Sequence, residues 1–170
     1  MRLLLTITIC LTLYAFCGCA GYKLGPSNGI AAGERSIQVT PFSNQTMEPR
    51  LGDAVTMALR RELQRDGTFR VATHGEADIA LTGVLTHFTR HELSFVPHDV
   101  LTVRDYRVSV IAHVTAREIS SGKVLLDRDV TNYTLVRFDN DLVSAERQAM
   151  PVLANDLATT VTSLLADGSW

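Results

Sequence analysis

Hydrophobic and polar positions alternate most regularly between residues 106 and 117 of the chain. The apolar positions are Tyr106, Val108, Val110, Ala112, Val114 and Ala116. The intervening and flanking positions carry Asp105, Arg107, Ser109, His113, Thr115 and Arg117, and only Ile111 interrupts this polar set. A period of two places the sets on opposite faces of a strand. The pattern therefore predicts a half-buried antiparallel strand with one polar face.

Shorter patterns predict further strands on either side of this one. Residues 79–86 alternate in the same way, and Ser120-Ser121-Gly122-Lys123 is a turn that leads into a hairpin partner at 124–136. Short apolar runs at 37–42 and 69–72 predict two more strands. We expect the connection from Thr89 to Asp105 to be a loop; it carries the apolar residues Phe95, Val96, Val100 and Leu101.

Two segments have apolar residues at helical spacing. The first begins near Pro49, ends at Gly67 and carries Leu51, Val55, Ala58, Leu59 and Leu63. The second carries Met150, Leu153, Leu157, Val161, Leu164 and Leu165. Ser144 can cap it, and Pro151 either kinks its start or marks it. We assign both stripes to the core.

The predicted fold is α+β: a two-layer sandwich with two helices on one face of a mixed, mostly antiparallel sheet of about four strands.

The N-terminus has the pattern of a bacterial lipoprotein signal. Arg2 precedes an apolar run at 3–16 that is too short to span a bilayer. Phe16-Cys17-Gly18-Cys19 fits a lipobox, so we expect a diacylglyceryl and an N-acyl lipid on Cys19. The alternative is an ordinary cleaved signal with a free cysteine nearby. The predicted organisation is a signal peptide at 1–18, an acylated N-terminus and short tether at 19–35, and one domain at 36–168.

Composition narrows the class of protein. All three cysteines, Cys10, Cys17 and Cys19, lie in the N-terminal segment, so the domain is expected to rest on an apolar core without disulfides. The net charge is −2. This charge argues against nucleic acid as a partner.

The chain carries no motif for catalysis or for a cofactor. It lacks a nucleophile elbow, a glycine-rich phosphate loop and an HExxH sequence. His87 and His91 would share a strand face but lie about 13 Å apart, too far for one ion. Asp127 and Asp129 are interpreted as solvated charges. We therefore predict no enzyme activity, no metal and no cofactor other than the lipid on Cys19.

Three motifs resemble those of the LPS-assembly lipoprotein family LptE. They are Cys19-Ala20-Gly21-Tyr22-Lys23-Leu24, then Val39-Thr40-Pro41-Phe42-Ser43-Asn44-Gln45-Thr46, and Ala77-Asp78-Ile79-Ala80-Leu81-Thr82-Gly83. The resemblance implies an outer-membrane lipoprotein, anchored on the periplasmic side, that plugs the LptD β-barrel, assists its assembly and binds lipopolysaccharide (LPS) during transport. The second and third motifs also occur in other lipoproteins. The alternative is therefore a peptidoglycan-synthase activator, or a component like a secretion channel or the TolB N-terminal domain.

Arg90, Arg104 and Arg107 are the candidate LPS-binding residues, because arginine suits the phosphates of lipid A. They lie in or near the predicted loop with its apolar residues. The alternative is a solvated strand face beside a loop that folds onto its own core.

Overall fold

The computed structural model describes residues 32–74, 76–97, 99–137 and 142–168. The signal peptide, Cys19 and most of the predicted tether lie outside the described residues. The elements are β1 (Arg35–Val39), β2 (Ser43–Asn44), α2 (Leu51–Asp66), β3 (Phe69–Val71), β4 (Ile79–Val96), β5 (Asp99–Glu118), β6 (Val124–Arg137) and α3 (Leu142–Ala166).

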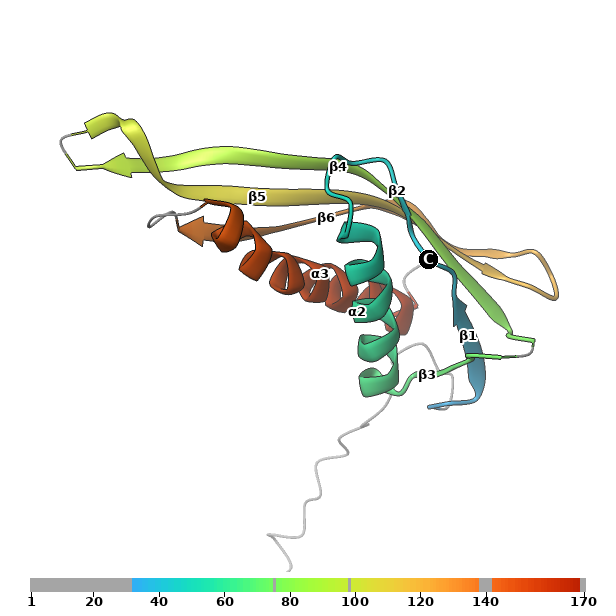
Figure 1. Ribbon diagram of the computed structural model, residues 1–170. Helices are drawn as coiled ribbons and strands as arrows, with labels where there is room; N and C mark the ends of the chain where they lie inside the picture. The colour runs from blue at the N-terminus through green and yellow to red at the C-terminus, as the bar shows by residue number, and fades with distance from the viewer. Residues whose placement is uncertain (1–31, 75, 98, 138–141, 169–170) are drawn as a thin grey trace, which may run out of the picture.

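The sheet has six strands, so the expectation of about four was too low. Its order is β3-β1-β4-β5-β6, and β2 pairs with β4 beside this path. β1 pairs in parallel with β3 and with β4, and β2 pairs in parallel with β4. β4, β5 and β6 form an antiparallel meander. The apolar run at 69–72 correctly predicted β3, whereas the two-residue β2 is too short for a pattern to reveal. Figure 1 shows α2 and α3 on the same side of the sheet.

β4 and β5 are far longer than predicted, and the expected loop from Thr89 to Asp105 is wrong. β4 continues to Val96 and β5 begins at Asp99, so most of that segment is a paired hairpin. Figure 1 shows this end of the hairpin extending past α3 and β6. Among the described residues, four register shifts interrupt the pairing: three add one unpaired residue to a strand, and the fourth, between Phe95 and Val96, skips residues 100–102 of β5. These bulges break the period of two, which is why the sequence pattern indicated a loop.

The helices pack as their stripes predicted. Leu59 and Leu63 of α2 and Leu157 and Val161 of α3 are fully buried against the sheet. Gly67 caps α2 with φ of 76°. Ser144 does not cap the second helix, because α3 already begins at Leu142 and contains Pro151 in its interior.

Candidate functional site

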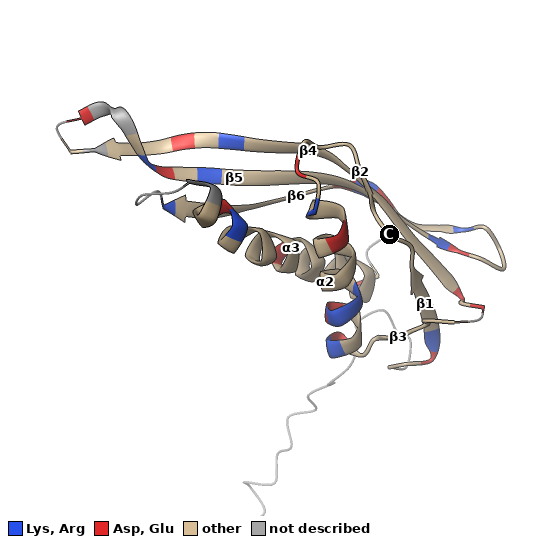
Figure 2. Ribbon diagram, viewed as in Figure 1, with Lys and Arg blue, Asp and Glu red and all other residues tan. Residues whose placement is uncertain are grey.

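The sheet face opposite the helices is exposed, and we call it the open face. On β5 and β6 it consists of Arg107, Ser109, Ile111, His113, Thr115, Arg117, Asp127, Asp129, Thr131, Tyr133, Leu135 and Arg137. Figure 2 shows that charged residues of both signs mark the strands as well as the helices. The strand periodicity predicted this polar face correctly.

Arg107 lies in the most apolar part of the open face. Its Cζ atom is 4.9 Å from the centroid of the Tyr133 ring, a cation–π distance. Tyr133 and Leu135 are 57% and 63% exposed. His91 on β4 pairs with Arg107 from the other side. An exposed tyrosine beside an arginine is typical of an interface anchor.

His113 is held between two carboxylates on the same face. Its Nδ1 lies 2.8 Å from Asp129 Oδ1 and its Nε2 lies 2.9 Å from Asp127 Oδ1. Carboxylate oxygens only accept, so both ring nitrogens must be protonated to donate. The hydrogen bond with Asp129, aided by the charge of Asp127, raises the pKa of His113 above its ordinary value. The two aspartates are exposed to solvent, as the sequence indicated, and both also pair with His113.

Arg90 lies on the opposite face, under the helices. Thr86 is the extra residue between the pairs Leu85–Ala112 and His87–Ile111, and it reverses the facing of the β4 residues from His87 to Glu92, up to the next bulge. Arg90 therefore pairs with the buried Val108 and points toward α2 and α3.

Two glutamates hold the Arg90 guanidinium. Its Nη2 lies 2.6 Å from Glu48 Oε1 and 3.0 Å from Glu146 Oε2, and its Nε also donates to Glu146. The bonds to Glu146, then those to Glu48, raise the pKa of Arg90. This ionic cluster ties β4 to the segment before α2 and to the first part of α3.

The second sequence motif positions Glu48. The Asn44 side chain accepts from the N–H and Oγ1 of Thr46 at 3.0 and 2.7 Å, and its Nδ2 donates to the Glu48 carbonyl at 2.6 Å. Phe42 N–H donates to Thr56 Oγ1 of α2 at 2.9 Å. The motif is therefore a rigid joint between β2 and α2.

The structure does not bring the three candidate arginines together. Arg90 is on the helix side, and Arg107 is on the open face. Arg104 is an extra residue in β5, because Ser94 pairs with Asp105 while the next residue, Phe95, pairs with Val103. The Ser94 hydroxyl, followed by Arg137, lowers the pKa of the neighbouring Asp105.

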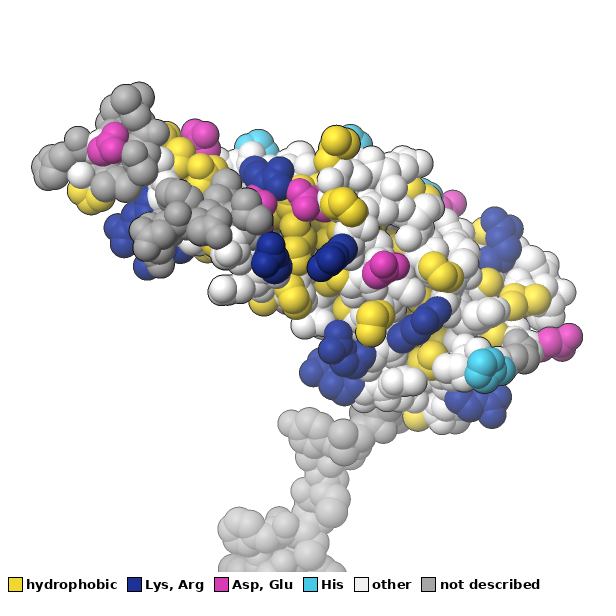
Figure 3. Space-filling view, in the orientation of Figure 1, with side chains coloured by type: hydrophobic (Ala, Val, Ile, Leu, Met, Phe, Trp, Pro, Cys, Tyr) yellow, Lys and Arg dark blue, Asp and Glu magenta, His cyan; other side chains and the backbone are white. Residues whose placement is uncertain are grey.

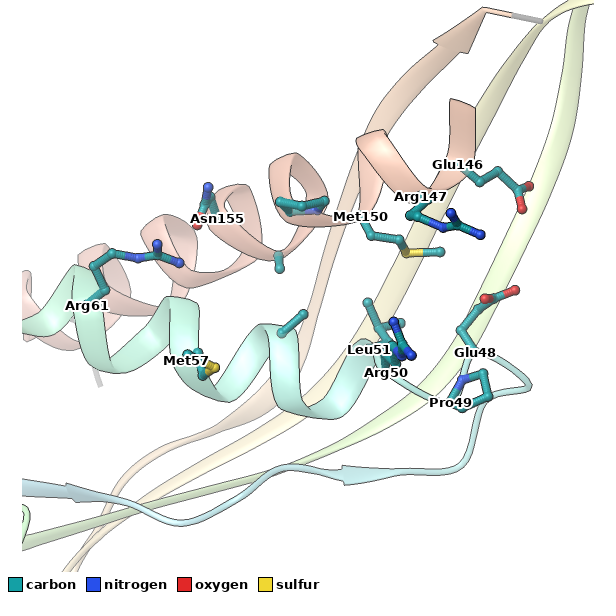
Figure 4. A pocket seen from close by; sticks show the side chains of 13 residues that line it. Glu48, Pro49, Arg50, Leu51, Met57, Arg61, Glu146, Arg147, Met150 and Asn155 are labelled. Carbon is teal, nitrogen blue, oxygen red and sulfur yellow. The ribbon is translucent and has the colours of Figure 1, made fainter. Parts of the chain in front are cut away.

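The sequence pattern missed a groove of about 520 Å³ between α2 and α3. Figure 4 shows Glu48, Arg50, Glu146, Arg147 and Met150 at one end of it. The helix stripes predicted the inner faces of the helices but carried no signal for the outer seam between them.

Within the described residues, no group of three or more histidine, cysteine or acidic side chains is placed to hold a metal ion. His98 lies outside those residues. In the same described ranges, none of the helices has the length and apolarity needed to cross a membrane.

Comparison with known proteins decides the family. A sequence model of LptE, described as lipopolysaccharide-assembly, matches residues 34–165. The chain belongs to the LptE family. LptE proteins are non-enzymatic lipoproteins of LPS assembly, which separates this chain from the alternative lipoprotein classes. None of the curated proteins matches the sequence.

Solved structures of low sequence identity share the LptE-like fold. Protein XCC0632 from Xanthomonas campestris has a TM-score of 0.64 at 12% identity, over 85% of this chain and 90% of that one. The PelC dodecamer from Paraburkholderia phytofirmans has 0.52 at 20% identity, over 84% and 94%. A putative lipoprotein from Caulobacter crescentus has 0.52 at 10%, over 74% and 88%. At these identities the likeness concerns the fold alone.

Proposed function

We propose that this LptE-family chain is an outer-membrane lipoprotein, anchored on the periplasmic side through lipid on Cys19. It assembles with an LptD-type β-barrel, plugs it, and binds LPS during transport to and insertion at the membrane surface. The family match over residues 34–165 carries this proposal. The chain acts by binding, and it needs no cofactor beyond its lipid anchor.

The open face supports the barrel contact. It is polar along most of its length, so it can face a wet lumen, and Tyr133 and Leu135 offer exposed apolar surface for a wall. The helices cover the other face, which leaves this one available to a partner.

Affinity purification from membranes in mild detergent tests the partner. The unmodified chain should recover a large outer-membrane β-barrel. Tyr133→Asp together with Leu135→Asp should reduce that recovery, because two charges would enter the interface. Val152→Asp is the matched control, since Val152 is 48% exposed on α3 and lies outside the open face. Recovery of a penicillin-binding protein without a barrel would contradict the proposal.

LPS binding needs a separate test of the arginines. Arg104→Glu with Arg107→Glu should weaken binding of purified LPS if phosphates meet this part of β5. Arg117→Glu is the control, because Arg117 lies on the same open face at the far end of β5. Unchanged binding removes Arg104 and Arg107 from the LPS contact.

A further inference from the structure

The groove between α2 and α3 has the size of a ligand site and an apolar lining. Its volume of about 520 Å³ lies within the range of roughly 300–1,000 Å³ for small-molecule pockets. Ala54 and Met57 line it from α2, and Met150 and Ala154 line it from α3. Met57 is 66% exposed. Figure 3 shows an apolar strip here, flanked on both sides by basic side chains.

The side chains that line the groove leave room for a flexible ligand. The two alanines keep side-chain bulk out of the seam, and the two methionines can adapt their unbranched chains to a partner. Ala154 belongs to the buried core, and Ala54 and Met150 are partly buried against it, so Met57 is the most exposed of the four. The groove is thus the outer edge of the core, left open between the two helices.

Among the described residues around the groove, the acidic side chains are paired, whereas the basic side chains are not. Its two carboxylates, Glu48 and Glu146, both engage Arg90. Arg50, Arg61 and Arg147 also line the groove, and within the part of the chain that the structure describes the side chains of these three make no hydrogen bond or ion pair. Available positive charge therefore surrounds an apolar floor.

Arg50 and Arg147 approach the same end of the groove from different segments. Figure 4 shows them on either side of the Met150 end, while Arg61 lies farther along α2. Two planar guanidinium groups from separate elements suit the oxygens of one phosphate.

We propose that this groove binds an acylated lipid that carries a phosphate. The acyl chain lies between Met57 and Met150, and Arg50 and Arg147 hold the phosphate. An extended peptide fits less well, because the helix backbones on both sides have no free groups to pair with its own. The identity of the lipid that reaches the groove in the cell rests on the proposed function. The groove adds a lipid contact site apart from Arg104 and Arg107.

Methionine methyl groups give a direct test on the full processed chain. After Cys19 the sequence contains only Met47, Met57 and Met150. The probe is monomeric dihexanoyl phosphatidate, added to protein labelled with ¹³C at the methionine methyls. The Met57 and Met150 signals should shift, whereas Met47, which is 94% exposed and not part of the groove, should stay.

Three further ligands separate the possible occupants. Dihexanoyl phosphatidylcholine should bind more weakly, because its headgroup is zwitterionic and the choline ammonium offsets the attraction of its phosphate to the arginines. Equal shifts with inorganic phosphate would reduce the site to an anion site and overturn the lipid proposal. Tighter binding of an acidic amphipathic peptide than of phosphatidate would also overturn it, in favour of a protein partner.

Variants define the contributions of charge and shape. Arg50→Gln with Arg147→Gln should weaken phosphatidate binding about tenfold or more. Arg70→Gln is the matched control, since Arg70 is exposed on β3 away from the groove. Ala54→Phe fills the groove and should weaken binding while leaving all arginines in place. Unchanged affinity in both groove variants would overturn the site.

The test of lipid binding in the groove is independent of barrel assembly. The groove variants keep the open face, so they should still recover the β-barrel in the purification above. Loss of the barrel with intact methyl shifts would count against the proposed function and not against the groove.

Discussion

The ring of Phe42 lies directly against the backbone of Gly83. A Cβ atom added to Gly83 would stand 2.2 Å from Cε1 of that ring. The two residues come from two separate sequence motifs, and Phe42 is only 5% exposed. Glycine is therefore required at position 83 by packing, and this contact links the joint before α2 to the first part of β4.

Gly83→Ala should lower the free energy of unfolding by about 1–3 kcal/mol, because a methyl group would be forced into a packed core. Denaturant unfolding measures the loss. Phe42→Leu removes ring atoms at the contact, so the double variant should lose less than the sum of the single variants. Strictly additive losses would show that the two residues do not touch.

Arg90 and Glu146 should be energetically coupled. A double-mutant cycle with Arg90→Met and Glu146→Gln is expected to give about 1 kcal/mol, the upper end for partly exposed pairs. The Glu146 side chain is only 12% exposed, which reduces screening by solvent. The coupling should fall in high salt.

The Arg65–Glu62 pair provides a comparison for that cycle. The Arg65 side chain is 74% exposed, so its coupling with Glu62 should be smaller. Equal coupling in the two pairs would contradict a structural role for the Arg90 cluster.

Stability should respond to the protonation of His113. Its pKa is raised from 6.5 by Asp129 and Asp127. The charged form is favoured by folding, so this stabilisation is fully present below the unfolded-state pKa and is lost as pH rises through the folded-state pKa. The difference in unfolding free energy between the unmodified chain and His113→Gln should shrink across that window.

NMR titration of the His113 ring checks the cause. Asp129→Asn should move the pKa of His113 back toward 6.5, because the largest contribution comes from the Asp129 hydrogen bond. A pKa that does not change in this variant would exclude the Asp129 bond as the cause.

Asp78 should stabilise the start of β4 in a manner that is lost in acid. Its Oδ2 accepts from the N–H and the hydroxyl of Ser36 at 2.7 and 2.6 Å. These bonds lower the pKa of Asp78 from 3.8, so its stabilisation is present above that value and disappears as pH falls through the lower folded-state pKa.

Asp78→Asn tests this by unfolding at neutral and at acidic pH. The variant should be less stable than the unmodified chain at neutral pH, and the gap should narrow in acid. Asp66→Asn is a control outside this strand contact. A gap that is constant with pH would rule out ionisation of Asp78 as the source.

The sequence alone determined the features that depend on local period. The alternation at 106–117 identified the buried and open faces of β5, and the helical spacing identified the core stripes of α2 and α3. Gly67 marked the end of α2 because a left-handed cap favours glycine. The motifs that contain Phe42 and Gly83 pointed to the family before the packing of these two residues could be known.

The tertiary structure decided everything that depends on register between distant strands. One extra residue at Thr86 turns Arg90 from the open face to the helices, and further bulges near Leu93 and Arg104 disguise a paired hairpin as a loop. A bulge is a property of two strands together, so neither strand's own pattern reveals it. The partners of Arg90 and His113 and the groove between the helices arise from the same long-range pairing.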